Sequence, residues 1–140
     1  MAALVEAMEP AGSIIAYNAP FERGVLKGCA NLLPQHAAWV ESLQPRIIDL
    51  LEPFRKFHCY HPAQHGSASI KAVLPAFTGK DYSQLAIGEG GTACLEFVRV
   101  TFTEVSAVER SRVRRHLQEY CNLDTLAMVW LIEKLQTLAG

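Results

Sequence analysis

A short apolar strand that leads directly into a helix is the feature that most constrains how this chain can fold. Residues 13–17 contain the run Ile14-Ile15-Ala16, a continuous apolar sequence typical of a buried parallel strand. Asn18-Ala19-Pro20 follows as a turn, and proline suits the first turn of the helix that we predict from Phe21 to Leu33. Because almost no linker separates the strand from the helix, the two are expected to pack together.

A second strand is predicted at Arg46–Leu50, after a further helix from Gln35 to Leu43. Strand, helix and strand in this order form a right-handed parallel unit. An additional helical segment is expected at Ala2–Met8, before Pro10 and Gly12. We therefore predict an α/β fold that is rich in helix and has a small parallel sheet.

The second half of the chain is predicted to be mainly helical. Residues 53–66 lack periodicity and are expected to form an ordered loop, after which Ser67 or Ser69 caps a short helix. Residues 95–105 carry conflicting signals, since their side chains favour a strand and the preceding Gly-Gly-Thr favours a helix start; we predict a helix. Ser106 and Glu109 form a capping-box pattern for a last helix that reaches about Leu135.

The apolar stripe of this last helix contains an acid. The stripe has the three-and-four spacing of a core-facing surface and consists of Leu117, Cys121, Asp124, Met128, Leu131 and Leu135. A carboxylate that faces a core must be paired, hydrogen-bonded or bound to a cation. Asp124 is therefore either a hydrogen-bond acceptor in the structure or part of a metal or substrate site. Tyr120, one turn earlier, projects from the same face.

Length and charge limit the classes of function. The chain has 140 residues, half of them apolar, which suits one domain, and its net charge of -1 gives no general attraction to nucleic acid. Any polyanion binding then needs a local patch or metal ions. The four scattered cysteines are expected to be reduced core thiols of an intracellular, cytoplasmic protein. No signal peptide or membrane span is predicted.

Several segments together resemble a known enzyme family. Asn18, Phe21 and Glu22 match the N-x-x-F-D motif, and Tyr120 and Asp124 the Y-x-x-x-D motif, of DEDD-type 3′-to-5′ exonucleases in the ribonuclease H-like superfamily. The segment 69–74 is similar to the S-L-K-x-L helix between those motifs. The runs YNAPFE, HPAQHGSASIKAVLP and YCNLDTLAMV resemble an uncharacterised bacterial family of such domains.

The resemblance implies a ribonuclease H-like fold and a metal-dependent reaction that hydrolyses phosphodiesters at single-stranded DNA or RNA ends. Mg²⁺ or Mn²⁺ would be held by Glu22 and Asp124, and Tyr120 would orient the attacking water. The catalytic residues implied are thus Tyr120, Asp124 and Glu22. Substrate contacts are implied for Asn18, Phe21, His65 and Lys71; the alternative for Lys71 is a position on the helix surface.

Two departures shape the expected function. Glu22 stands where most of these exonucleases have Asp, and the family's first motif, Asp-x-Glu on the first strand, has no match. We therefore expect a truncated domain, residues 1–140, that binds metal weakly or not at all and is inactive unless an upstream segment supplies the missing acids. The alternative is a non-catalytic binding or assembly module. Without the strand that carries the first motif, an uncovered edge predicts a homodimer.

Other polar groups have competing interpretations. His58, Cys59, His61 and His65 could suggest zinc, but the spacing is weak evidence and hydrogen-bonded loop histidines are the expected interpretation. Asp49 is predicted to be a turn acceptor. Trp39 and Trp130 are assigned to the core or an interface. A basic run is either a solvated helix face or a contact for a nucleic-acid backbone, and it consists of Arg110, Arg112, Arg114, Arg115 and His116.

Overall fold

The computed structural model describes residues 1–140, which form two compact units, residues 1–70 and residues 71–140. Each unit is described by itself. The chain is rich in helix and has one two-stranded parallel sheet, as predicted from the sequence. No helix is both long enough and apolar enough to cross a membrane.

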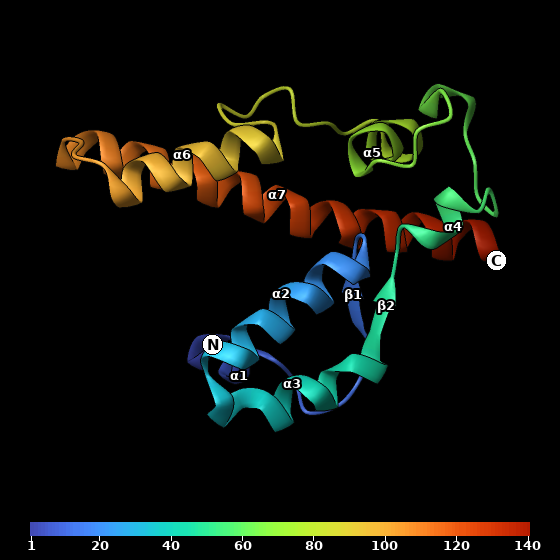
Figure 1. Cartoon of the computed structure of the whole chain (residues 1–140). Helices are drawn as coiled ribbons and strands as arrows, with labels where there is room; N and C mark the ends of the chain where they lie inside the picture. The colour runs from blue at the N-terminus through green and yellow to red at the C-terminus, as the bar shows by residue number, and fades with distance from the viewer. The chain divides into compact units, whose positions relative to one another are not determined.

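The first unit holds both strands, four α-helices and three 3₁₀ turns (Figure 1). Its elements are α1 (Ala2–Ala7), β1 (Ile14–Ala16), α2 (Ala19–Leu32), the 3₁₀ turn η1 (Pro34–His36), α3 (Ala37–Leu43), η2 (Gln44–Arg46), β2 (Ile47–Asp49), α4 (Glu52–Arg55) and η3 (Pro62–Gln64). The segment predicted as a loop therefore contains two short helical turns, each with a proline in its first turn, where the missing N–H costs nothing.

The parallel pairing of β1 and β2 confirms the predicted strand-helix-strand unit. Ile14 pairs with Ile47, Ile15 with Ile48 and Ala16 with Asp49. A small cluster of Ala16, Ala19 and Ile47 forms where the sheet meets α2. The prediction of a buried first strand holds for Ala16, whereas Ile14 and Ile15 are half-buried, and on β2 the Ile48 side chain is 50% exposed. Two strands have too few neighbours to cover both faces.

Arginine side chains hold the segments around the sheet in place. The Arg46 guanidinium donates hydrogen bonds to the carbonyl oxygens of Glu9, Ala11 and Gly12 at 2.8–2.9 Å, so it fixes the irregular chain that precedes β1. Arg23 on α2 donates to the Ile47 carbonyl at 2.9 Å. These bonds give partners to carbonyl oxygens of the segment before β1 and of β2.

The second unit is helical. Its elements are α5 (Ile70–Thr78), whose first residue ends the first unit, α6 (Gly90–Phe102) and α7 (Ala107–Ala139). The prediction of a helix over residues 95–105 is confirmed for residues 95–102, since α6 ends at Phe102, and α6 lies against α7 (Figure 1). The last helix extends four residues beyond the predicted end at Leu135.

The buried side of α7 differs from the predicted stripe at two positions. The fully buried residues are Val113, Ala127 and Leu131, and the half-buried Tyr120 and Asp124 lie on the same line. This line follows a seven-residue repeat and leaves Cys121 exposed. The prediction of core thiols is therefore wrong for Cys121, and also for Cys94, which is exposed on α6. All four cysteines are free thiols, and Cys29 and Cys59 are half-buried.

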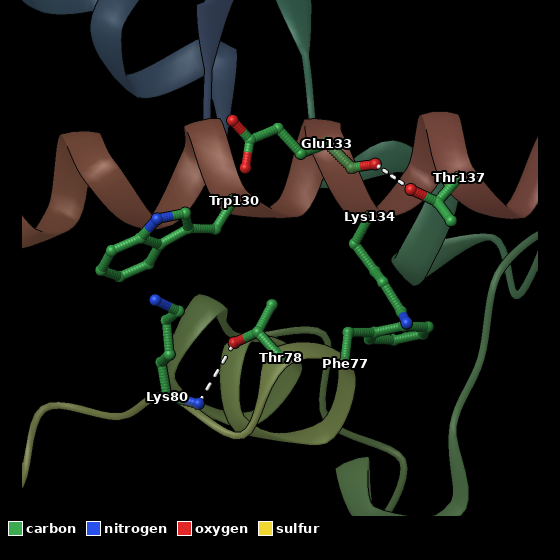
Figure 2. A pocket seen from close by; sticks show the side chains of 7 residues that line it. All are labelled: Phe77, Thr78, Lys80, Trp130, Glu133, Lys134 and Thr137. Atoms are coloured by element: carbon green, nitrogen blue, oxygen red, sulfur yellow. Dashed lines mark hydrogen bonds between the residues drawn. The ribbon is translucent and has the colours of Figure 1, made fainter.

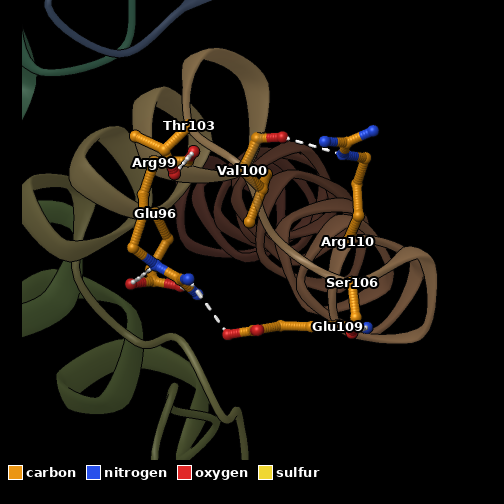
Figure 3. Close-up of polar contacts among 7 residues, drawn as sticks. All are labelled: Glu96, Arg99, Val100, Thr103, Ser106, Glu109 and Arg110. Atoms are coloured by element: carbon orange, nitrogen blue, oxygen red, sulfur yellow. Dashed lines mark hydrogen bonds and ion pairs between the residues drawn. The ribbon is translucent and has the colours of Figure 1, made fainter.

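The start of α7 uses only half of the predicted capping box. Ser106 Oγ accepts a hydrogen bond from the Glu109 N–H at 3.1 Å. The Glu109 carboxylate turns instead to Arg99 on α6, at 3.0 Å, and Arg99 also pairs with Glu96 (Figure 3). The hydrogen bond from Arg99 holds the pKa of the Glu96 carboxyl below its usual value. The Glu109 carboxylate therefore links α7 to α6, because the Arg99 guanidinium lies within ion-pair distance.

Candidate functional site

Asp124 has a protein partner on the buried side of α7. The Tyr82 hydroxyl donates a hydrogen bond to Asp124 Oδ1 at 2.7 Å. Tyr82 lies in the segment between α5 and α6, and only 7% of its surface is exposed. Because the phenol can donate only one proton, it fixes one carboxylate oxygen and leaves the other able to accept from a second group.

Tyr120 and Lys71 complete a group of four side chains, which we call the Tyr120–Asp124 cluster: Lys71, Tyr82, Tyr120 and Asp124. The rings of Tyr82 and Tyr120 are 6.1 Å apart between centroids. Lys71 Nζ lies 5.5 Å from each ring centroid, within the range of a cation–π contact. Three residues predicted to form the site, Lys71, Tyr120 and Asp124, are thus brought together in the second unit.

Burial and charge keep the Tyr120 phenol protonated. Burial, and then the Asp124 carboxylate, raise the pKa of Tyr120 to about 12. A phenol with this pKa is a hydrogen-bond donor at neutral pH and cannot act as a base. Gly90, the first residue of α6, lies beside this hydroxyl, since a Cβ there would be 3.4 Å from Tyr120 Oη. A Cβ at position 90 would therefore make a van der Waals contact with the phenol.

In the first unit, polar residues gather where β1 and β2 end. The Asn18 and Leu51 N–H groups donate to Asp49 Oδ1 at 2.9 and 3.0 Å, so Asp49 is a turn acceptor, as predicted. Glu22 lies in the first turn of α2, and its Oε2 is buried without a hydrogen-bond partner. An orphaned carboxylate oxygen at a strand edge is costly unless a donor or a cation reaches it.

The other residues implied to contact substrate have little support from packing. Asn18 adopts a left-handed backbone conformation with φ of 75°, which asparagine tolerates well, and its side chain does not cap α2. The Phe21 side chain is 66% exposed. His65 is exposed and also left-handed, with φ of 49°. Tyr17 at the end of β1 donates to the Ala68 carbonyl at 2.6 Å.

The carboxylates within either unit are too few for the metal chemistry that the resemblance implies. Neither unit holds a group of three or more His, Cys, Asp or Glu side chains that could bind a metal ion. Asp124 is the one acid of its cluster, and a phenol already occupies one of its oxygens. A two-metal cluster needs several carboxylates, so the donor set of each unit does not fit one. That Glu22 and Asp124 share a cation concerns both units and stays a prediction.

The histidine-rich segment is organised by its own backbone. His61 Nδ1 accepts from the Ala63 N–H at 3.2 Å, and Gln64 Oε1 accepts from the His61 N–H at 2.8 Å. This reciprocal pair caps η3 and gives His61 the structural role expected of a loop histidine. Gln64, which the sequence analysis did not single out, is the buried polar residue of this turn.

The basic run on α7 divides into different roles. Arg110 donates to the Val100 carbonyl near the end of α6 at 3.0 Å, so it holds the two helices together (Figure 3). Arg115 forms a long ion pair with Glu119 at 3.8 Å on an exposed surface. Arg112 and Arg115 line an open hollow of about 740 Å³ beside Val108. Arg112 and Arg115 therefore lie on a solvated helix face, which was the first of the two interpretations of the basic run.

A second pocket was not predicted from the sequence. It has a volume of about 330 Å³ and lies between the end of α5 and the last part of α7 (Figure 2), lined by Phe77, Thr78, Lys80, Trp130, Glu133, Lys134 and Thr137. Lys80 Nζ lies 3.8 Å from the centroid of the Trp130 ring. Trp130 is half-buried, so it belongs to a pocket wall and not to the core.

Comparison with known proteins concerns mainly the first unit. No curated protein and no solved structure matches the chain. A family model described as "Domain of unknown function (DUF2779)" matches residues 1–69, which is nearly the whole of the first unit. The first unit is therefore similar to a family whose description gives no function.

Proposed function

We propose that this chain belongs to a metal-dependent 3′-to-5′ exonuclease-like domain of ribonuclease H-like fold, which acts on phosphodiesters at nucleic-acid ends. In this proposal the 140 residues bind a single-stranded end but do not hydrolyse it by themselves. Hydrolysis requires further carboxylates, of the kind that an Asp-x-Glu motif would supply.

The observation that supports the proposal most is the Tyr120–Asp124 cluster. Lys71, which the resemblance links to substrate, is far in sequence from the motif residues Tyr120 and Asp124 and meets them in the second unit. The cluster offers a cation, a phenolic donor and a carboxylate acceptor within one small region. A terminal nucleotide presents the complementary groups, which are phosphate oxygens and a sugar hydroxyl.

Each side chain has a defined task in this proposal. Lys71 pairs with a phosphate near the terminus, and the protonated Tyr120 donates a hydrogen bond to a phosphate oxygen. Asp124 accepts from the terminal hydroxyl through the oxygen that Tyr82 leaves available. Since the carboxylates within each unit are too few for a two-metal cluster, no cleavage step is assigned to these residues.

Fluorescence polarisation with labelled oligonucleotides tests the proposal. We expect binding of single-stranded DNA or RNA with a free 3′ hydroxyl, and weaker binding when that hydroxyl is blocked by phosphate. Lys71→Ala should weaken binding by about tenfold, the effect of one charged hydrogen bond. The matched control is Lys56→Ala, because Lys56 is a half-exposed lysine of the first unit that pairs with Glu52. Absence of binding, or equal effects of the two substitutions, would contradict the proposal.

A non-catalytic binding or assembly module is the second candidate. The hydrogen bond from Tyr82 favours it, because it gives Asp124 a partner without any metal ion. Under this alternative, Asp124→Asn and Tyr82→Phe change the stability of the protein and leave oligonucleotide binding unaltered.

A further inference from the structure

We propose that the pocket between α5 and α7 binds a nucleoside monophosphate, with the base against Trp130 and the phosphate held by Lys80 and Lys134. This pocket shares no residue with the Tyr120–Asp124 cluster, so the inference goes beyond the proposed function. Its volume of about 330 Å³ lies at the lower end of the range for small-molecule sites, ~300–1,000 Å³. A single nucleotide is a ligand of suitable size.

The walls of the pocket combine aromatic faces with cations that have no carboxylate partner. Trp130 and Phe77 contribute rings, and Lys80 and Lys134 contribute ammonium groups; Figure 2 shows Lys134 extending toward Phe77. Neither lysine forms an ion pair with a carboxylate. Rings beside cations that lack a carboxylate partner are the combination by which proteins bind nucleotides without reading sequence, by stacking on the base and pairing with the phosphate.

The α7 helix supplies one side of the pocket. Trp130, Lys134 and Thr137 follow the i, i+4, i+7 spacing of a single α7 face. Thr78 and Thr137 donate their hydroxyl protons to carbonyls of their own helices, at Leu74 and Glu133. Thr78 Oγ1 already accepts from the Lys80 N–H at 3.2 Å, so of the two hydroxyls Thr137 is left as the acceptor. Glu133 at the rim adds a further acceptor for base N–H groups. The pocket therefore presents a cation beside each ring, together with acceptors from Thr137 and Glu133 (Figure 2).

Lys80 must move for the base to stack. Its ammonium lies 3.8 Å from the centre of the Trp130 ring, where the base would sit. Lys80 is exposed and its stem is flexible, so it can exchange this contact for an ion pair with the phosphate. Stacking of a base on an indole is at least as favourable as an exposed cation–π contact. Lys80 and Trp130 then exchange their mutual contact for contacts with the phosphate and the base.

Trp130 fluorescence tests this inference directly. The experiment uses the full chain carrying Trp39→Phe, which leaves Trp130 as its one tryptophan. Thymidine 5′-monophosphate should quench the emission and reach saturation, while thymidine should bind more weakly and inorganic phosphate should cause no stacking quench. A parallel titration with a short oligo(dT) distinguishes a nucleic-acid strand from a free nucleotide as the ligand. Tighter binding of oligo(dT) than of the monophosphate indicates a strand, and equal binding indicates a free nucleotide.

Lysine substitutions test whether the quenching of Trp130 reports binding at this pocket or nonspecific quenching. Lys80→Ala and Lys134→Ala should each weaken binding of the monophosphate by about tenfold, and Lys80→Ala should leave thymidine binding unchanged or stronger. Lys56→Ala serves as the control for charge. Asp124→Asn should leave the titration unchanged, so a failure of the proposed function is distinguishable from a failure here. Unsaturable quenching, equal binding of thymidine and its monophosphate, or no effect of either lysine would overturn the proposal.

Discussion

The hydrogen bond from Tyr82 gives Asp124 a partner on a helix face that is otherwise apolar. Tyr82→Phe removes that donor, and the predicted cost is about 1–2 kcal/mol in the free energy of unfolding at neutral pH, because the carboxylate oxygen loses its partner. Asp124→Asn retains an acceptor oxygen and should cost less. Urea denaturation provides the measurement, with Tyr60→Phe, at an exposed position, as the control.

A double-mutant cycle checks that the two residues act together. Tyr82→Phe combined with Asp124→Asn should show a coupling energy above ~0.5 kcal/mol, as is usual for residues in contact. Additive effects would mean that the hydrogen bond contributes nothing to stability.

The raised pKa of Tyr120 predicts a pH dependence at alkaline pH. Its pKa is 10.0 in a model compound and about 12 in the folded protein, so folding favours the neutral phenol. The resulting stabilisation is complete below pH 10 and is lost as the pH rises from 10 to about 12. The parent should therefore lose more stability across this window than Tyr120→Phe. Parallel loss in the two proteins, measured by urea denaturation, would show that Tyr120 titrates normally.

Among the elements, the start of α7 depends on one serine. Ser106→Ala removes the acceptor for the Glu109 N–H and should cost about 1 kcal/mol. Glu109→Gln should cost less, because its carboxylate caps nothing and forms a half-exposed pair with Arg99. Thermal or urea unfolding compares the two variants. A larger loss for Glu109→Gln would mean that the link between helices matters more than the cap.

The elements could be predicted from the sequence where a local signal decides them. The run Ile14-Ile15-Ala16, the proline at position 20 and the capping serine at position 106 each act within a few residues, and the structure has the expected elements there. The exact buried line of α7 was missed because neighbouring positions such as Tyr120 and Cys121 are only about 100° apart around a helix. An apolar cysteine then looks like the better core residue.

The tertiary contacts of the site could be predicted only in part. The i, i+4 spacing already places Tyr120 and Asp124 together, but the contact of Asp124 with Tyr82 spans 42 residues. No periodicity marks the segment that holds Tyr82, so no sequence signal points to it. The pocket at Trp130 was missed for the same reason, since Lys80 follows the end of α5 in an irregular turn.

For the molecule as a whole, the open edge of the sheet predicts self-association. β1 pairs with β2 on one side and with no strand on the other. On α2, Phe21, Val25 and Leu32 form an exposed apolar stripe and are 66%, 50% and 82% exposed. Apolar stripes and open edges recruit a second chain, so a homodimer is predicted.

Light scattering at micromolar concentration measures the oligomeric state. The parent should have twice the mass of the chain, and Val25→Lys should shift it toward monomer if the α2 stripe is buried in the dimer. A parent that is monomeric over the whole concentration range would contradict the prediction.

One time course tests the proposed function most directly. A single-stranded oligonucleotide with a free 3′ hydroxyl and a 5′ label is mixed with the 140-residue chain, and Mg²⁺ or Mn²⁺ is then added while polarisation is recorded. The expected result is a rise in polarisation that depends on Lys71, followed by no metal-dependent decrease, because the acids within each unit are too few to hold two metal ions. Rapid metal-dependent loss of polarisation that Asp124→Asn abolishes would contradict this, as would the absence of any initial rise.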